Sequence, residues 1–190
     1  MAFDAQCDLA AVVYGADDDP DRLFIDFADD LSRSGRRVVG LVQVGRSCQS
    51  EHPTLGAMVL PGGDVVPLVE QLQPPATGCR LDTRRLAAVA KRVATAIADG
   101  SDLLIINRFG RTESEGRGLT DLITHALDAD IPVLLAVPER RFAACIKFSD
   151  GMNVRLACRR EALDRWWQSL AGSVKRREPN GACTFCEMGK

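Results

Sequence analysis

The sequence lacks the features that mark membrane proteins and bulk nucleic-acid binders. No stretch approaches the roughly 20 consecutive apolar residues of a membrane-spanning helix, and no basic segment precedes the short apolar run near the N-terminus. The formal net charge is -2 at pH 7, so an overall positive field is missing as well. We therefore expect a cytoplasmic protein without membrane insertion or a nucleic-acid partner, in which any anion is bound by local charge.

Cysteine and histidine do not indicate a disulfide framework or a nucleophilic catalytic set. The seven cysteines are an odd number spread along the chain, which suits reduced thiols, and there are only two histidines. Cys183 and Cys186 form a single Cys-x-x-Cys pair, but the second pair that would complete a zinc site is absent. The pair lies in a polar segment, residues 173–190, which we interpret either as a weak metal site or as a reducible tail.

What the sequence does contain is an alternation of apolar strands and amphipathic helices. Apolar runs rich in β-branched residues predict core strands, and apolar residues at three- and four-residue spacing predict the helices between them. The strands are expected at 9–14, 37–44, 102–107 and 131–138. This pattern predicts one α/β domain over residues 1–172, with a mostly parallel sheet and helices on both faces. Residues 45–80, rich in Gly and Pro, are predicted to form a hairpin-like insertion.

The loop after the first strand is acidic. In an open parallel sheet the ligand lies beyond the carboxyl ends of the strands, and a phosphate-binding loop at this place would offer several glycines and a lysine. Here Gly15 is followed by aspartates that include Asp17 and Asp18, and no lysine is present. The aspartates would repel a triphosphate unless a divalent cation such as Mg²⁺ intervened. The alternative is that they only complement the positive end of the following helix.

The loop after the third strand, within LLIINRFGRTESEGRGL at 103–119, has the opposite chemistry. Arginine forks and hydroxyls suit oxyanions, and glycines let backbone N–H groups turn toward one point. The candidate ligand-binding residues are Asn107, Arg108, Gly110, Arg111, Thr112, Ser114, Gly116, Arg117 and Gly118. The alternative is that the arginines pair with Glu113, Glu115 and the aspartates of the first loop. In a third interpretation, the acidic loop holds the arginines until a ligand displaces it.

The order of these parts, above all NRFGRTESEGRGL followed by IPVLLAV, resembles an uncharacterised bacterial family known as a domain of unknown function. That family is in turn similar to small P-loop nucleoside-triphosphatases, and the resemblance covers about residues 8–170. It implies a P-loop-like three-layer α/β sandwich with a degenerate phosphate-binding loop. The family is often associated with molybdate transport, so the resemblance also implies a molybdate-like oxyanion as ligand.

One part of the motif departs from the nucleoside-triphosphatases. There, the third strand typically ends in Asp-Glu-hydrophobic-Gly with a glutamate three residues later, and the acids serve magnesium and the attacking water. The matching positions here are Asn107, Arg108, Phe109, Gly110 and Glu113. Only the glycine and the last glutamate match, so most of the charge that stabilises phosphoryl transfer is missing.

The leading hypothesis is therefore binding of a small oxyanion or phosphorylated ligand, in molybdenum metabolism. One alternative is an active nucleoside-triphosphatase that uses Mg²⁺ at Asp17, Asp18 or Glu113, with Glu113 as the candidate catalytic residue. Another is an interaction module whose tail cysteines bind metal. A homo-oligomer is compatible with each hypothesis.

Overall fold

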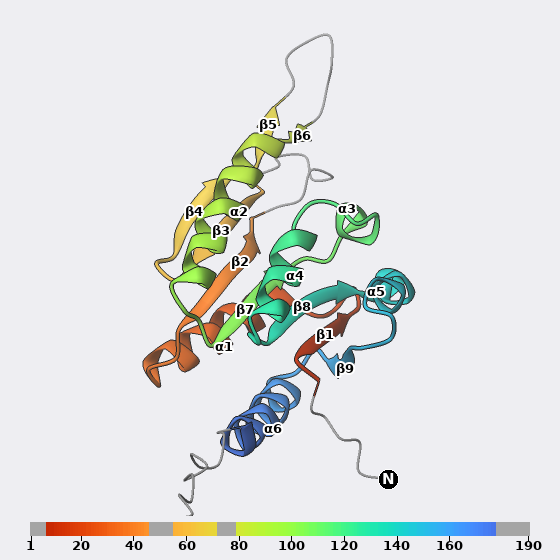
Figure 1. Ribbon diagram of the computed structural model, residues 1–190. Helices are drawn as coiled ribbons and strands as arrows, with labels where there is room; N and C mark the ends of the chain where they lie inside the picture. Colours follow the sequence, from red (N-terminus) through yellow and green to blue (C-terminus); the bar gives the residue numbers. More distant parts are fainter. Residues whose placement is uncertain (1–6, 46–54, 72–78, 178–190) are drawn as a thin grey trace, which may run out of the picture.

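The computed structural model describes residues 7–45, 55–71 and 79–177, which form a seven-stranded sheet, a two-stranded sheet and the helices packed on them (Figure 1). The strands are β1 (Leu9–Tyr14), β2 (Val38–Val44), β3 (Gly56–Leu60), β4 (Asp64–Pro67), β5 (Val69–Gln71), β6 (Cys79–Leu81), β7 (Leu103–Asn107), β8 (Val133–Pro138) and β9 (Val154–Ala157). The helices are α1 (Pro20–Arg33), α2 (Thr83–Ala98), α3 (Arg111–Ser114), α4 (Thr120–Asp128), the 3₁₀ turn η1 (Glu139–Arg141), α5 (Phe142–Phe148) and α6 (Arg160–Arg177).

The larger sheet is mostly parallel, as predicted. Its strand order is β4-β3-β2-β7-β8-β1-β9. The neighbouring pairs β2–β7, β7–β8, β8–β1 and β1–β9 are parallel. The described residues between β2 and α2 extend this sheet with two antiparallel strands, β3 and β4, and then form the separate β5–β6 pair. The carboxyl ends of β1, β2, β7 and β8 therefore meet at one edge of the sheet.

Two apolar cores lie on opposite faces of the sheet and give the molecule three layers. Successive strand residues alternate between them, so Leu9 and Ala11 belong to one core and Ala10 and Val12 to the other. Helices α2, α4 and α5 cover the first face, and α1 and α6 cover the second (Figure 1). The predicted α/β sandwich is confirmed.

The helices begin where side chains can satisfy their first backbone N–H groups. Asp19 accepts a hydrogen bond from the N–H of Arg22 at 3.0 Å, and Pro20 follows it as the first helical residue of α1. Asp82 accepts from the N–H groups of Arg84 and Arg85 at 3.0 and 3.1 Å at the start of α2. These caps fix how α1 and α2 leave the strands that precede them.

Helix α6 reaches Arg177 and so continues beyond residue 172, where the sequence pattern suggested the domain would end. Its Trp166 is buried and donates from Nε1 to the carbonyl of Cys7 at 3.0 Å. Cys183 and Cys186 lie outside the described residues. Among the described helices, none has the length and apolar character needed to cross a membrane.

Candidate functional site

A cavity of about 290 Å³ opens at the carboxyl edge of the sheet. The ligands of open parallel sheets lie beyond the carboxyl ends of the strands, which we call the strand-end rule, so a ligand is expected here. One side of the cavity is polar and cationic, formed by residues after β7 and β8. The other side is mostly apolar and comes from β2, β3, β6, α2 and the residues next to these strands. The polar lining includes Asn107, Arg108, Arg111, Thr112, Glu113, Arg140 and Arg141.

Glu113 is a buried carboxylate that braces the loop between β7 and α4. It is 6% exposed, and its Oε2 accepts from the N–H of Gly110 at 2.9 Å. Its Oε1 accepts from the N–H of Leu119 at 3.3 Å, across the one-turn helix α3. Both oxygens of the candidate catalytic residue are therefore already engaged by the backbone.

Arg108 is held by the first turn of α1. Its Nη2 lies 3.1 Å from Oδ2 of Asp21, and its guanidinium stands 5.6 Å from the centre of the Tyr14 ring. Asn107 donates from Nδ2 to Oδ1 of the same aspartate at 2.7 Å. Burial raises the pKa of Tyr14 above its usual value, and the neighbouring Arg108 partly opposes this rise. Asp21 thus joins the acidic segment to the arginine loop.

The other aspartates of the first loop take no part in this contact. Asp18 accepts from the N–H of Gly15 at 2.8 Å and closes the turn after β1. Asp17 is exposed and makes no hydrogen bond or ion pair within the described ranges. The acidic partner of Arg108 is therefore neither of the two aspartates singled out from the sequence.

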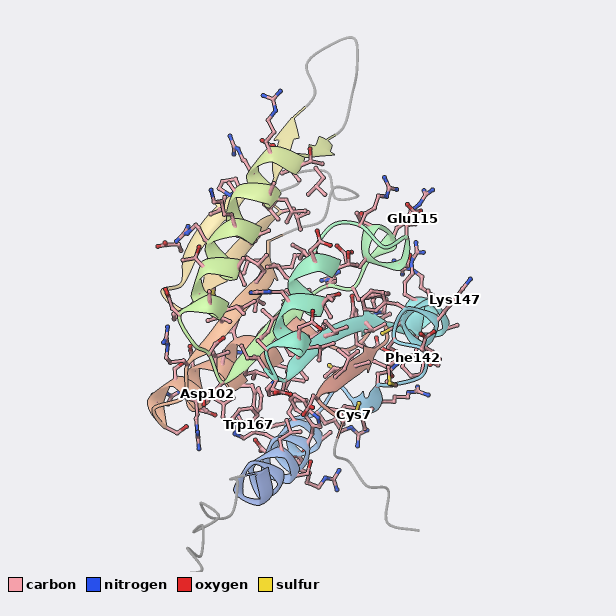
Figure 2. The ribbon with its side chains drawn as sticks, viewed as in Figure 1. Cys7, Asp102, Glu115, Phe142, Lys147 and Trp167 are labelled. Carbon is pink, nitrogen blue, oxygen red and sulfur yellow. The ribbon has the colours of Figure 1, made fainter. Side chains whose placement is uncertain are left out.

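Glu115 neutralises the remaining two arginines of the loop. Arg111 Nε lies 2.8 Å from Glu115 Oε1, and Arg117 donates to Oε2 of the same carboxylate. The hydrogen bond from Arg111, followed by the one from Arg117, lowers the pKa of Glu115. Figure 2 shows Glu115 at the end of α3, near the labelled side chains of α5. All three arginines of the loop are thus paired with acids, namely Asp21 and Glu115. Glu113, which the ion-pair interpretation also named, forms no ion pair among the described residues.

The candidate residues from the sequence divide into two groups. Asn107, Arg108, Gly110, Arg111 and Thr112 line the cavity together with Glu113. The other candidates shape the loop outside it: these are Ser114, Gly116, Arg117 and Gly118. Ser114 donates from Oγ to the carbonyl of Arg111 at 2.7 Å, which closes the turn of α3.

Sequence reasoning missed Arg140 and Arg141, which line the same cavity from η1. Neither forms an ion pair with any residue that the structure describes. They follow directly after β8, so the strand-end rule that singled out the loops after β1 and β7 would have found them as well. They add two cations that are not already neutralised.

Two buried polar atoms beside the cavity have no partner among the described residues: Asn107 Oδ1 and Arg108 Nε. Asn107 is only 5% exposed, so bulk solvent has little access to it. An unsatisfied buried polar group typically costs about 1–3 kcal/mol. Such atoms are rare in native proteins and often mark the place of a water or ligand.

A second cavity, of about 370 Å³, adjoins the first at Tyr14, Arg108, Pro138 and Arg140. It lies at the β1–α1 loop, where a phosphate-binding loop would stand. Its acidic lining residues are Asp18, Asp19, Asp21 and Glu139. Within the described ranges, no group of three or more His, Cys, Asp or Glu side chains is arranged to hold a metal ion. The two cavities therefore differ in charge, and the positive one lies on the β7–β8 side.

Comparison with known proteins places these features in a family. The chain is 40% identical over 172 residues to the molybdenum import ATP-binding protein ModC 2 of Bradyrhizobium diazoefficiens, a match that covers 88% of this chain and 19% of that relative. The crystal structure of THEP1 from the hyperthermophile Aquifex aeolicus matches 88% of the chain and 99% of its own, with a TM-score of 0.60 and 13% identity.

The solution structure of a human cancer-related nucleoside triphosphatase matches 89% of this chain and 98% of its own, with a TM-score of 0.54 and 12% identity. Both likenesses confirm the P-loop nucleoside-triphosphatase type of fold. A family model described as "Protein of unknown function (DUF2478)" matches residues 9–166, and the chain belongs to this family.

Proposed function

We propose that this protein binds a small anion, either an oxyanion such as molybdate or a phosphorylated compound, in the cavity at the carboxyl edge of its sheet. One observation carries the proposal: four guanidinium groups line this cavity, and Glu113 is the one carboxylate among its described lining residues. Glu113 accepts two backbone N–H groups and forms no ion pair with these arginines among the described residues. Guanidinium groups bind phosphate-like oxygens in pairs of hydrogen bonds.

The neighbouring cavity is acidic, and this also favours the cationic cavity as the place where an anion binds. An anion at the β1–α1 loop would face Asp18, Asp19 and Asp21, and like charges disfavour that approach. On the other side of Arg108 the charge has the opposite sign. The anion site would therefore be displaced from the position of a phosphate-binding loop toward β7 and β8.

The arginines would play unequal parts. Arg140 and Arg141 are free to meet an anion directly, whereas Arg111 is engaged by Glu115. Arg108 would turn from Asp21 toward the ligand, which would also give its unpaired Nε a partner. In this scheme Asp21 is the resting partner that an anion replaces.

The name of ModC 2 agrees with an anionic ligand, because it refers to ATP binding and to molybdenum import. This chain spans only 19% of the length of ModC 2, so the ligands that its name indicates are proposals for this chain. The test therefore includes both molybdate and nucleotides.

Isothermal titration and thermal-shift measurements with molybdate, tungstate, sulfate, phosphate and nucleotides test the proposal. A ligand at 100 times its dissociation constant should stabilise the protein by about 2.7 kcal/mol. Arg141→Ala should weaken binding by roughly tenfold, since a charge-assisted hydrogen bond is worth about 1.5–3 kcal/mol. Arg165→Ala on α6 removes the same charge far from the cavity and should leave affinity unchanged. Absence of binding by every anion in the panel would contradict the proposal.

Nucleotide hydrolysis is a second candidate, favoured by the reference to ATP in the name of ModC 2. The site offers this reaction little, because Asn107 and Arg108 stand where the related enzymes carry acids. Release of phosphate from ATP in the presence of magnesium, lost in Glu113→Gln, would support it. A metal-binding role of the tail would instead appear as bound metal that disappears in Cys183→Ser, Cys186→Ser protein.

A further inference from the structure

We infer that the ligand is an organic phosphate with an apolar or flat body, rather than a bare inorganic oxyanion. This inference rests on the proposed function, since it names the chemical class of the anion bound at the same site. Three properties of the cavity support it: its size, its division into two sides, and the unpaired acceptor at Asn107.

The cavity is larger than a bare oxyanion requires. Its volume of about 290 Å³ compares with about 30 Å³ for one water molecule in the liquid, so it has room for roughly ten waters. A tetrahedral oxyanion has five heavy atoms and would fill a minor part of this space. Cavities that hold organic ligands begin at about 300 Å³. The remaining volume therefore suits an organic group attached to the anion.

The two sides of the cavity match the two ends of such a molecule. The arginines stand on the β7–β8 side, whereas the apolar wall stands on the β3–β2 side, and the sheet order separates the two. The wall is formed by Leu41, Ala57, Leu68 and Leu86, of which Leu86 is half-buried and the others are buried. Burial of apolar ligand surface against this wall is favourable. A bare oxyanion would leave the half-buried Leu86 in contact with water.

The charge and hydrogen-bond pattern favours a phosphate group as the anionic end. Several guanidinium groups suit an anion with up to two negative charges spread over terminal oxygens. Asn107 lines the cavity, and its buried Oδ1 can only accept a hydrogen bond. A singly protonated phosphate group, in inorganic phosphate or in an ester, supplies the O–H donor that this oxygen lacks. The molybdate and sulfate dianions carry only acceptor oxygens. The lone pairs of these oxygens would repel those of Asn107 Oδ1.

The test compares inorganic phosphate, sulfate and molybdate with methyl phosphate and phenyl phosphate by isothermal titration on the full chain. Phenyl phosphate should bind at least about tenfold more tightly than inorganic phosphate, because its ring buries apolar surface against the wall. Leu86→Gln should remove most of this advantage and leave the affinity for inorganic phosphate unchanged. Leu23→Gln, at a half-buried leucine on the opposite face of the sheet, is the matched control. If Leu86→Gln does not fold, Leu86→Ala replaces it.

The outcomes separate the two proposals. If no anion binds, the proposed function itself is lost. If inorganic anions bind as tightly as phenyl phosphate, the proposed function stands and the organic ligand is excluded. If phenyl phosphate binds more tightly but Leu86→Gln does not change this preference, the assignment of the organic group to the apolar wall is wrong.

Discussion

Glu113 shows how one side chain can dictate the shape of a loop. Its carboxylate connects the N–H groups of Gly110 and Leu119, and Gly118 packs directly against it. A β-carbon built on Gly118 would lie 2.3 Å from Glu113 Oε1, so no larger residue fits without disturbing these hydrogen bonds. Gly118 thus leaves room for Glu113, for which the sequence suggested either catalysis or an ion pair with the arginines.

Gly118→Ala should therefore destabilise the protein by about 2–4 kcal/mol, through the clash and through the positive φ of 72° at this position. Gly116→Ala is the matched control. Its φ of 71° is nearly the same, but a β-carbon there would meet nothing within 4 Å, so the loss should be about 1 kcal/mol. Urea unfolding of both variants measures the difference in the free energy of unfolding. Equal losses of stability would show that Glu113 moves away from the new β-carbon at no cost in free energy.

Asp21 is expected to compete with the ligand for Arg108. Asp21→Asn should raise anion affinity about fivefold, because one negative charge at short range in a partly screened site is worth about 1 kcal/mol or more. The amide oxygen can still accept from Asn107, so the fold is retained. Asp17→Asn removes the same charge from an exposed position and should have little effect on the titration. A fall in affinity in Asp21→Asn would show that Asp21 orients Arg108 for the ligand instead of withholding it.

The thiol of Cys158 should react slowly at neutral pH although it is only half-buried. Burial, followed by the charges of Asp18, Asp19 and Asp21, raises its pKa to about 11. Because the thiolate is the reactive form, alkylation should become about tenfold faster per pH unit between pH 8 and pH 10. Mass spectrometry of the peptide containing Cys158 after brief exposure to iodoacetamide follows this rate. A rate that levels off between pH 9 and pH 10 would indicate an ordinary thiol.

Among the elements, those with a regular apolar period were predictable and those without one were not. The runs that became β1, β2, β7 and β8 and the stripes that became α1 and α2 are read directly from the sequence. The period describes one element at a time, so it could not reveal that β3 and β4 continue the main sheet. That arrangement depends on contacts between segments far apart in the chain.

In the candidate site too, features that depend on neighbouring residues were predictable, and contacts between distant segments were not. The arginine loop and its place at a strand end follow from the sequence, because they depend on neighbouring residues. The partner of Arg108 does not, since the rotation of α1 decides that Asp21 contacts Arg108 at the end of β7. Asp17 lies in the loop before this helix and is exposed. Whether Glu115 binds one arginine or two depends on the turn of α3, which a short stretch without periodicity does not predict.

Helix α6 is tied to the rest of the fold by Trp166. Trp166→Phe keeps most of the buried surface but leaves the carbonyl of Cys7 without its donor, so it should destabilise the protein by about 1–3 kcal/mol. Trp167→Phe is the matched control, because Trp167 is only partly buried beside the same core and should lose less than about 1 kcal/mol. Thermal and urea unfolding compare the two variants. Equal losses would mean that the hydrogen bond contributes nothing beyond packing.

For the whole molecule, the contrast between a net charge of -2 and a cationic cavity should make anion binding sensitive to salt. The Debye length falls from about 10 Å at 0.1 M to about 3 Å at 1 M ionic strength, so the pull of the arginines on an anion weakens. We expect affinity for phosphate to fall about tenfold or more over this range, in titrations with chloride as the added anion. An affinity independent of salt would indicate that uncharged groups dominate binding.

Arg140 and Arg141 stand on η1, a single 3₁₀ turn between β8 and α5. A turn of this kind has few backbone hydrogen bonds of its own, so its amides exchange with solvent readily. An anion held by these two side chains would tie the turn to the end of β7. The signature of binding would then be slower deuterium uptake at residues 139–142, rather than in the arginine-rich loop that first drew attention in the sequence.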